Sequence, residues 1–284
     1  MSKIAIITDT DSSLPFNITN AKGITQVPII IQFGDESFRD GYDINNETLF
    51  ARIDKENKLP TTAAPSPGQF VEAFKKAISD GAESILCFNI SSEMSATYAS
   101  AKQAAEMFPG KRIEVVDTRS LAMGQGYMVL AASEAVEKGS SIDEAIKIAL
   151  EIRDSTYLFG SLATLKYIAM SGRVSALAAG MAGLLDIKPV LSLQNGKLEL
   201  LEKIRTQTKS WNRAIDLVKE KSAGRKIEKM SILHVRAPEA GHQFESLIRS
   251  AVPCPDEIIF AEIMPGLSIH TGAGMVAVVF TVSK

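Results

Sequence analysis

Short apolar runs that alternate with segments of helical periodicity dominate the first half of the chain. The first run, residues 3–8 (Lys-Ile-Ala-Ile-Ile-Thr), is almost continuously apolar, as is typical of a strand buried on both faces of a parallel sheet. Similar runs occupy residues 84–88 and 113–116. Parallel neighbours need crossover connections, usually helices, so the alternation predicts an α/β domain with a mostly parallel sheet and helices on both faces.

The same half contains further predicted elements around this sheet. A strand is expected at residues 24–33, and helices are expected at residues 46–54, 68–79, 95–108, 121–137 and 142–154. A polar turn at residues 9–13 follows the first strand, at the edge where open α/β sheets place their ligands.

The second half changes character near Tyr157. Residues 188–193 and 197–204 flank Asn195-Gly196, a dipeptide that supplies the positive φ angles of a type I′ hairpin turn. The other predicted elements are strands at 229–235 and 258–262 and helices at 209–222 and 239–251. A hairpin mixed with such units predicts a separate α+β domain with a mixed or antiparallel sheet. We therefore expect an N-terminal domain at residues 1–156 and a C-terminal domain at residues 157–284.

Charge and cysteine usage narrow the class of protein. The chain has 31 basic and 33 acidic residues, a formal net charge of −2, and no block of like charge. Nucleic acid is therefore not expected as a partner, because such binding depends on clustered Lys and Arg. Cys87 and Cys254 form no disulfide or zinc pattern, which favours a reducing compartment.

The chain ends bear on location. The N-terminal residues run directly into a strand and show no signal peptide, so a cytoplasmic location is expected. Residues 263–283 contain no charged side chain, and a segment of this length could in principle span a bilayer. Pro265, three glycines and His270 interrupt them, and residues 275–282 are strand-like. We interpret the segment as a buried loop and strand, and we expect no stable membrane insertion.

Two hydroxyl-rich motifs stand where helices are expected to begin. Residues 60–70 contain Thr62 in a loop closed by prolines, and residues 89–98 follow an apolar strand. Ser92 or Ser95 suits the N-cap of the second helix, since a serine oxygen accepts from first-turn amides. Neutral donors beside a helix N-terminus favour anions, so Thr62, Ser95 and nearby amides are candidate ligands of a carboxylate. Simple helix capping remains the competing explanation.

Other chemistries find less support in the sequence. Gly124-Gln-Gly126 lacks the third glycine of a dinucleotide fingerprint, and no Walker-type loop is present, so no cofactor is expected. The three histidines are widely spaced, which makes a metal site improbable. A serine hydrolase elbow is absent, but a Ser92–His270 pair keeps a lipid hydrolase open as the alternative function, because triads are defined by geometry.

An apolar segment at residues 174–185 is rich in alanine and glycine nearly all round. Such a helix must be buried in protein or against a ligand. A tightly packed core helix and a helix that lines a lipid tunnel both explain this composition.

Five short motifs in order give the chain a family resemblance. They are residues 8–15 (Thr-Asp-Thr-Asp-Ser-Ser-Leu-Pro), 62–68 (Thr-Ala-Ala-Pro-Ser-Pro-Gly) with 91–98 (Ser-Ser-Glu-Met-Ser-Ala-Thr-Tyr), 165–174 (Leu-Lys-Tyr and Ser-Gly-Arg-Val), 187–191 (Ile-Lys-Pro-Val-Leu) and 270–274 (His-Thr-Gly-Ala-Gly). Together they resemble the DegV family of bacterial fatty-acid-binding proteins over the whole chain. Glu93 departs from the family pattern, and a carboxylate beside an anion site must point away from it.

The resemblance implies a specific role. Similar proteins bind a long-chain fatty acid between their two domains and present its carboxylate to the separate ATP-binding subunit of fatty acid kinase, so the chain itself would be a carrier and not an enzyme. The carboxylate-binding residues implied here are Thr62, Ser95, Ser92 and His270. Arg173 is assigned to the encounter with the kinase, because a guanidinium can grip phosphate.

Overall fold

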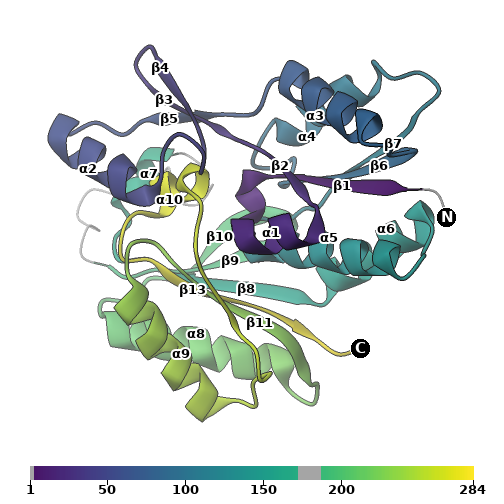
Figure 1. Cartoon of the computed structure of the whole chain (residues 1–284). Helices are drawn as coiled ribbons and strands as arrows, with labels where there is room; N and C mark the ends of the chain where they lie inside the picture. Colours follow the sequence, from purple (N-terminus) through teal and green to yellow (C-terminus); the bar gives the residue numbers. More distant parts are fainter. Residues whose placement is uncertain (1–2, 172–186) are drawn as a thin grey trace. The chain divides into compact units, whose positions relative to one another are not determined.

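Two compact units make up the chain, which is described by a computed structural model covering residues 3–171 and 187–284 (Figure 1). Contacts assign Met1–Asn45 with Leu59–Asp154 to the first unit, and Asn46–Lys58 with Ser155–Lys284 to the second. Residues 46–58, which were expected in the first domain, make most of their contacts within the second unit.

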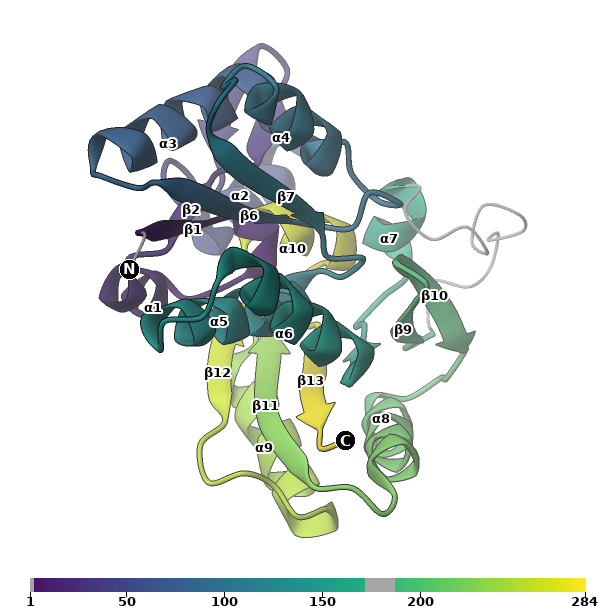
Figure 2. The ribbon, with the colours of Figure 1, turned by 90° about the vertical axis from the view of Figure 1, so that its right-hand side faces the viewer.

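The first unit contains the predicted parallel sheet, with strand order β2-β1-β6-β7. These strands are β1 (Ile4–Asp9), β2 (Thr25–Val27), β6 (Ser84–Asn89) and β7 (Arg112–Asp117). All three pairings are parallel. Figure 2 shows α3 (Pro67–Ser79) and α4 (Thr97–Ala105) on one face, and α5 (Ala122–Glu137) with α6 (Ile142–Asp154) on the other. A short helix, α1 (Phe16–Lys22), links β1 to β2.

The prediction of one strand over residues 24–33 is wrong. The segment forms β2 and then β3 (Ile30–Phe33), which belongs to a different sheet. Pro28 lies at the break and has no N–H to donate to a sheet ladder. A turn beginning at Gly34, with φ 59°, leads to β4 (Glu36–Arg39), and β5 (Thr61–Ala63) completes a three-stranded antiparallel sheet in the order β4-β3-β5.

The second unit contains a six-stranded mixed sheet in the order β10-β9-β8-β13-β11-β12. The predicted hairpin is confirmed: β9 (Val190–Gln194) and β10 (Lys197–Glu202) flank Asn195 and Gly196, at φ 50° and 82°. The other elements are α2 (Asn46–Glu56), β8 (Thr156–Ser161), α7 (Lys166–Ser171), α8 (Gln207–Ser222), β11 (Ile227–His234), α9 (Pro238–Ala251), β12 (Ile259–Glu262), α10 (Pro265–Thr271) and β13 (Val276–Val282).

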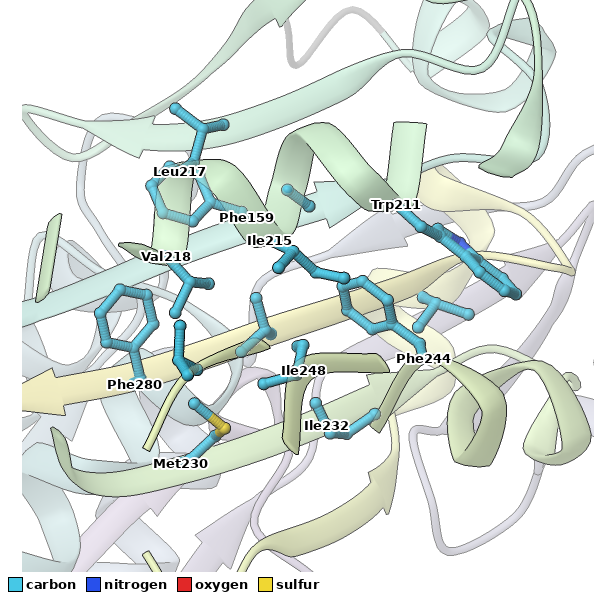
Figure 3. Close-up of a cluster of buried hydrophobic side chains, with 14 of the residues drawn as sticks. Phe159, Trp211, Ile215, Leu217, Val218, Met230, Ile232, Phe244, Ile248 and Phe280 are labelled. Carbon is cyan, nitrogen blue, oxygen red and sulfur yellow. The ribbon is translucent and has the colours of Figure 1, made fainter. Parts of the chain in front are cut away.

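Helices α8 and α9 bury an apolar face against this sheet (Figure 3). Trp211 from α8 and Phe244 from α9 pack with ring centroids 5.7 Å apart. Phe280 of β13 contacts both Tyr157 and Phe159 of β8, with ring centroid distances of 5.5 and 6.3 Å. The burial of these aromatic side chains, together with the aliphatic residues around them, stabilises the unit.

The uncharged segment at residues 263–283 forms α10 and then the fully buried strand β13. The strand is confirmed, but the expected loop is largely a short helix. Among the described residues, no helix has the length and apolar character needed to cross a membrane. The apolar segment at residues 174–185 lies outside the described residues.

Two family motifs meet inside the second unit. Gly272 follows α10 with φ 80°, and a Cβ on it would lie 2.2 Å from Cδ2 of Tyr167. Tyr167 in turn meets Phe50 edge-to-face, with ring centroids 6.0 Å apart. Glycine is therefore required at 272 both for its backbone conformation and for the close approach of the tyrosine ring.

Gly272→Ala should destabilise the second unit more than Gly224→Ala does. Both glycines have positive φ, 80° and 74°, but nothing lies within 4 Å of a Cβ at Gly224. Both variants place a Cβ at positive φ, and at Gly272 the ψ of 162° adds a conformation that essentially only glycine adopts. Only Gly272→Ala also adds overpacking, of about 1–3 kcal/mol. Denaturant unfolding measures the difference, and equal losses would contradict the packing described here.

Candidate functional site

Polar side chains gather where the parallel strands of the first unit end. Strands β1, β6 and β7 end in Asp9, Asn89 and Asp117. The register pairs Thr8 with Phe88 and Asn89 with Asp117, so the three terminal residues lie side by side. Open α/β sheets bind ligands at this edge.

The buried carboxylate of Asp9 accepts hydrogen bonds from three different parts of the unit. Its Oδ1 accepts from Asp11 N at 3.1 Å and from Gln125 Nε2 at 3.0 Å. Its Oδ2 accepts from Ile90 N at 2.9 Å and from Asn89 Nδ2 at 3.2 Å. The turn after β1, the turn after β6 and helix α5 are therefore held at one point.

Thr10 connects this point to the three-stranded sheet. Its hydroxyl donates to Asp40 Oδ2 at 2.6 Å and accepts from Ile29 N at 3.0 Å. Ile29 immediately precedes β3, and Asp40 immediately follows β4. The motif at residues 8–13 is thus an internal joint of the first unit, and its side chains are almost completely buried.

Burial changes the ionisation of the two carboxyls in this motif. Desolvation raises the pKa of Asp9 to about 6, although its four N–H donors oppose the shift. Burial, with the charges of Asp9 and Asp40, raises the pKa of Asp11 well above its ordinary value. Within the described part of the chain, Asp11 Oδ1 and Gln125 Oε1 find no hydrogen-bond partner. Asp11 is therefore disposed to remain neutral, whereas Asp9 is ionised at neutral pH.

The loop after β6 carries two of the predicted site residues. Ser92 Oγ donates to Asp117 Oδ2 at 2.5 Å, and Ser92 N donates to Asp117 Oδ1 at 3.1 Å. Ser95 is half-buried; its Oγ accepts from Thr97 N at 3.3 Å and lies 2.8 Å from Thr97 Oγ1. The Ser92 proton is directed to a protein carboxylate, so the hydrolase alternative gains no support from this contact.

The prediction that Ser92 or Ser95 caps the second helix is wrong. Helix α4 begins at Thr97, and its N-cap is Ala96, which has no side-chain oxygen. Ser95 instead makes its bond to Thr97 N from the turn that precedes the helix. This start of α4 therefore lacks the usual side-chain cap.

Thr62 lies on a strand and not in the predicted loop. It is the middle residue of β5, half-buried, and pairs with Ile31 of β3. Downstream of it, Ser66 and Gln69 form a reciprocal capping box at the start of α3, with Gln69 Oε1 accepting from Ser66 N at 2.9 Å. The first turn of α3 is thus capped by the protein itself.

Glu93 lies between Ser92 and Ser95, and Arg119 lies opposite it on the loop after β7. Arg119 Nη2 is 3.8 Å from Glu93 Oε1, and both side chains are exposed. Arg119 has φ 48°, an uncommon conformation for a residue with a Cβ. The guanidinium partly neutralises the acidic departure from the family pattern.

Of the two remaining predicted residues, the structure describes His270. His270 is half-buried in the last turn of α10, so its expected place in a glycine-rich loop is corrected to the end of a short helix. Arg173 lies outside the described residues. Across residues 3–171 and 187–284, no group of three or more His, Cys, Asp or Glu is arranged to hold a metal ion.

From the sequence, Asp9 was predicted only as the start of a polar turn at the ligand-binding edge of the sheet, and Asp117 was not predicted as a site residue. The available signal was their position: each directly follows an apolar strand of the parallel sheet, where side chains from neighbouring strands meet.

Comparison with known proteins agrees with this architecture. The model of the DegV family matches residues 3–283. The chain belongs to the DegV family. A DegV domain-containing protein of Streptomyces coelicolor is 32% identical over 276 residues, 97% of each chain. One from Mycobacterium tuberculosis is 31% identical over 277 residues, covering 97% of this chain and 96% of its own.

Solved DegV structures share the fold. A DegV family protein of Thermus thermophilus, described as binding fatty acid, superposes with a TM-score of 0.89 at 29% identity and covers 99% of this chain and 100% of its own. A fatty acid binding DegV family protein of Streptococcus agalactiae gives a TM-score of 0.90 at 25% identity, with both chains covered completely. The α/β and mixed-sheet architecture expected from the sequence is confirmed.

Titration of Asp9 should make the stability of the first unit pH-dependent. Its folded pKa of about 6 lies above its ordinary 3.8, so the folded chain holds this proton more tightly than the unfolded chain. The resulting stabilisation is complete below pH 3.8 and is lost as pH rises through about 6. Asp9→Asn should remove this contribution from urea unfolding measured across that range. A pH profile identical to that of the unchanged chain would contradict the assignment.

At neutral pH, Asp9→Asn and Asp11→Asn should differ in sign or size. An amide at position 9 turns its own N–H groups toward existing donors, which should lower the free energy of unfolding by about 1–3 kcal/mol. Asp11→Asn keeps the shape and removes a buried acid, so stability should be unchanged or higher. Equal losses in the two variants would contradict the described roles.

Proposed function

We propose that this DegV family chain binds a long-chain fatty acid and presents it to a fatty acid kinase. The observation that carries the proposal is the whole-chain likeness to a fatty acid binding DegV protein of Thermus thermophilus, at a TM-score of 0.89 and 29% identity. The chain would act as a carrier, with the fatty acid as its ligand and without a cofactor of its own. The absence of a Walker-type loop from its sequence agrees with that division of labour.

Neutral hydroxyls would hold the carboxylate of the ligand. Thr62 and Ser95 are half-buried in the first unit and can donate to an anion, and His270 of the second unit is the proposed third contact. Ser92 shares the loop of Ser95, while its proton is directed to Asp117. A donor set of this kind recognises a carboxylate without a permanent cation.

The acyl chain would supply most of the affinity. Burial of roughly fourteen methylenes at ~0.8 kcal/mol each gives on the order of 11 kcal/mol before association and ordering costs. Hydrogen bonds to the charged head group add about 1.5–3 kcal/mol each. The tail therefore sets affinity, and the hydroxyls set orientation. A ligand of this kind should survive purification.

Solvent extraction and mass spectrometry of the purified protein should identify one long-chain fatty acid per chain. Thr62→Val keeps the side-chain shape but removes a donor, so it should weaken fatty acid binding by about tenfold or more in titrations. Thr61→Val is the matched control: Thr61 is the neighbouring residue of β5, its side chain lies on the opposite face of the strand, and it is exposed.

Equal affinities of the Thr61→Val and Thr62→Val variants would remove Thr62 from the site. A protein that carries no lipid and takes up none in titration would contradict the proposal as a whole. Incubation with short and long acyl esters tests the lipid hydrolase alternative. Release of fatty acid that disappears in both Ser92→Ala and His270→Ala would favour that enzyme class instead.

Arg173→Ala should separate binding from presentation. If the guanidinium meets the kinase or the new phosphate, its loss should leave lipid affinity nearly unchanged and lower phosphorylation at saturating lipid by about tenfold or more. Lipid titration and turnover with a fatty acid kinase subunit measure the two effects. Loss of lipid comparable to that of Thr62→Val, with turnover restored by excess lipid, would place Arg173 in the head-group site.

A further inference from the structure

We propose that Asp117 is a positioning residue that fixes the loop carrying Ser95, and that Ser92 acts through Asp117 and not on the ligand. The inference rests on the proposed function, because Ser95 is there a contact of the fatty acid carboxylate. It assigns a role to a carboxylate that would otherwise only weaken anion binding by repulsion.

Asp117 accepts three hydrogen bonds from two loops. The loop after β6 contributes Ser92 Oγ at 2.5 Å and Ser92 N at 3.1 Å. The loop after β7 contributes Arg119 N at 2.9 Å. Ser92 and Asp117 are 25 positions apart in sequence, so the two bonds from Ser92 join segments that are distant along the chain. A carboxylate has the acceptor capacity for three donors, whereas an amide oxygen accepts only two.

The other side of the same loop is held by Asp9. Its Oδ2 accepts from Ile90 N at 2.9 Å, two residues before the amide that Asp117 accepts. Three further bonds join these segments: Ser91 N donates to Ser120 O at 2.9 Å, and Thr118 N and Oγ1 donate to Asn89 O at 3.1 and 2.7 Å. Carboxylates from both neighbouring strands therefore hold the chain as it leaves β6.

A tight turn transmits this position to Ser95. Met94 N and Ser95 N both donate to Ser91 O, at 3.0 and 3.1 Å. Ser91 lies between Ile90 and Ser92, whose amides are held by Asp9 and Asp117, so the backbone position of Ser95 is fixed relative to this segment. Release of Ser92 from Asp117 would free one side of that turn. A displacement of about 1 Å at a binding group is enough to cost a large part of its effect.

Because Asp117 is negatively charged, its removal can distinguish a positioning role from simple charge repulsion by the direction in which fatty acid affinity changes. Removal of a negative charge near a carboxylate ligand should tighten binding if charge is what matters. Loss of positioning should weaken it. The two explanations therefore predict opposite changes in the dissociation constant of a fatty acid.

The experiment compares full-length variants in titrations with oleate. Asp117→Ala should weaken binding by about tenfold or more. Asp117→Asn retains one acceptor oxygen and should give an intermediate loss; it decides the question if Asp117→Ala does not fold. Glu114→Gln is the matched control, because Glu114 lies on the same strand, is exposed and pairs with Arg112. It should bind oleate as the unchanged chain does.

A double-mutant cycle with Ser95→Ala tests whether Asp117 acts through Ser95. The double variant should bind no more weakly than the weaker single variant, since the hydroxyl that Asp117 positions is already gone. Hydrogen exchange of the amides at residues 90–96 should be faster in Asp117→Ala than in Glu114→Gln. This readout does not depend on the ligand.

Tighter or unchanged oleate binding in Asp117→Ala, or full additivity in the cycle, would overturn the proposal. If the unchanged chain binds no fatty acid, the proposed function fails. In that case, unchanged exchange at residues 90–96 would overturn the clamp as well, and faster exchange would support it.

Discussion

The buried carboxylate of Asp9 is the interaction on which the first unit depends. An ionised carboxylate without solvent is costly, and four N–H donors from the turn after β1, the exit of β6 and helix α5 offset that cost. The arrangement is demanding, because the loss of the acceptor leaves several buried donors unpaired at once. Its pKa of about 6, above the ordinary 3.8, indicates that desolvation raises the pKa by more than the four donors lower it. The main role of the motif around Asp9 is therefore structural: it holds the turn after β1, the exit of β6 and helix α5 together.

Through Asp9 and Thr10, the segments that carry Thr62 and Ser95 are held in a fixed arrangement within the first unit. Asp9 holds the exit of β6, from which the loop to Ser95 starts. Thr10, the next residue, bonds both Ile29 and Asp40 and so fixes the ends of β3 and β4. Strand β5 with Thr62 then pairs with β3. The hydroxyls of residues 62 and 95, which are 33 positions apart in sequence, are thus both positioned by segments that bond to the buried pair Asp9 and Thr10.

The periodicity of the sequence predicted the long helices and the parallel strands, but it did not predict the short strands. The parallel strands, the long helices and the Asn195-Gly196 hairpin could be predicted because each has a strong local pattern. Strands β4 and β5 could not, since strands of four and three residues carry too little pattern and gain their stability from pairing. Thr62 and Ser95 could be proposed as ligand contacts from their motifs. The hydrogen bonds of Asp9 and Asp117 could not be predicted, because most of their partners are distant in sequence and only the register of β1, β6 and β7 brings them together.

Acidic groups lie on or against the loop that carries Ser95, a proposed contact of an anion, and their own hydrogen bonds and ion pairs explain how both can coexist there. Asp9 and Asp117 accept from backbone amides and polar side chains, so their charge is directed into the protein framework. Glu93 faces Arg119. Burial favours the neutral form of Asp11. The charged residues therefore serve to build the loops, and the proposed contacts of a ligand carboxylate are neutral groups. Since a hydroxyl brings no fixed charge, affinity for a fatty acid would have to come from its apolar chain, which suits a carrier that must also release it.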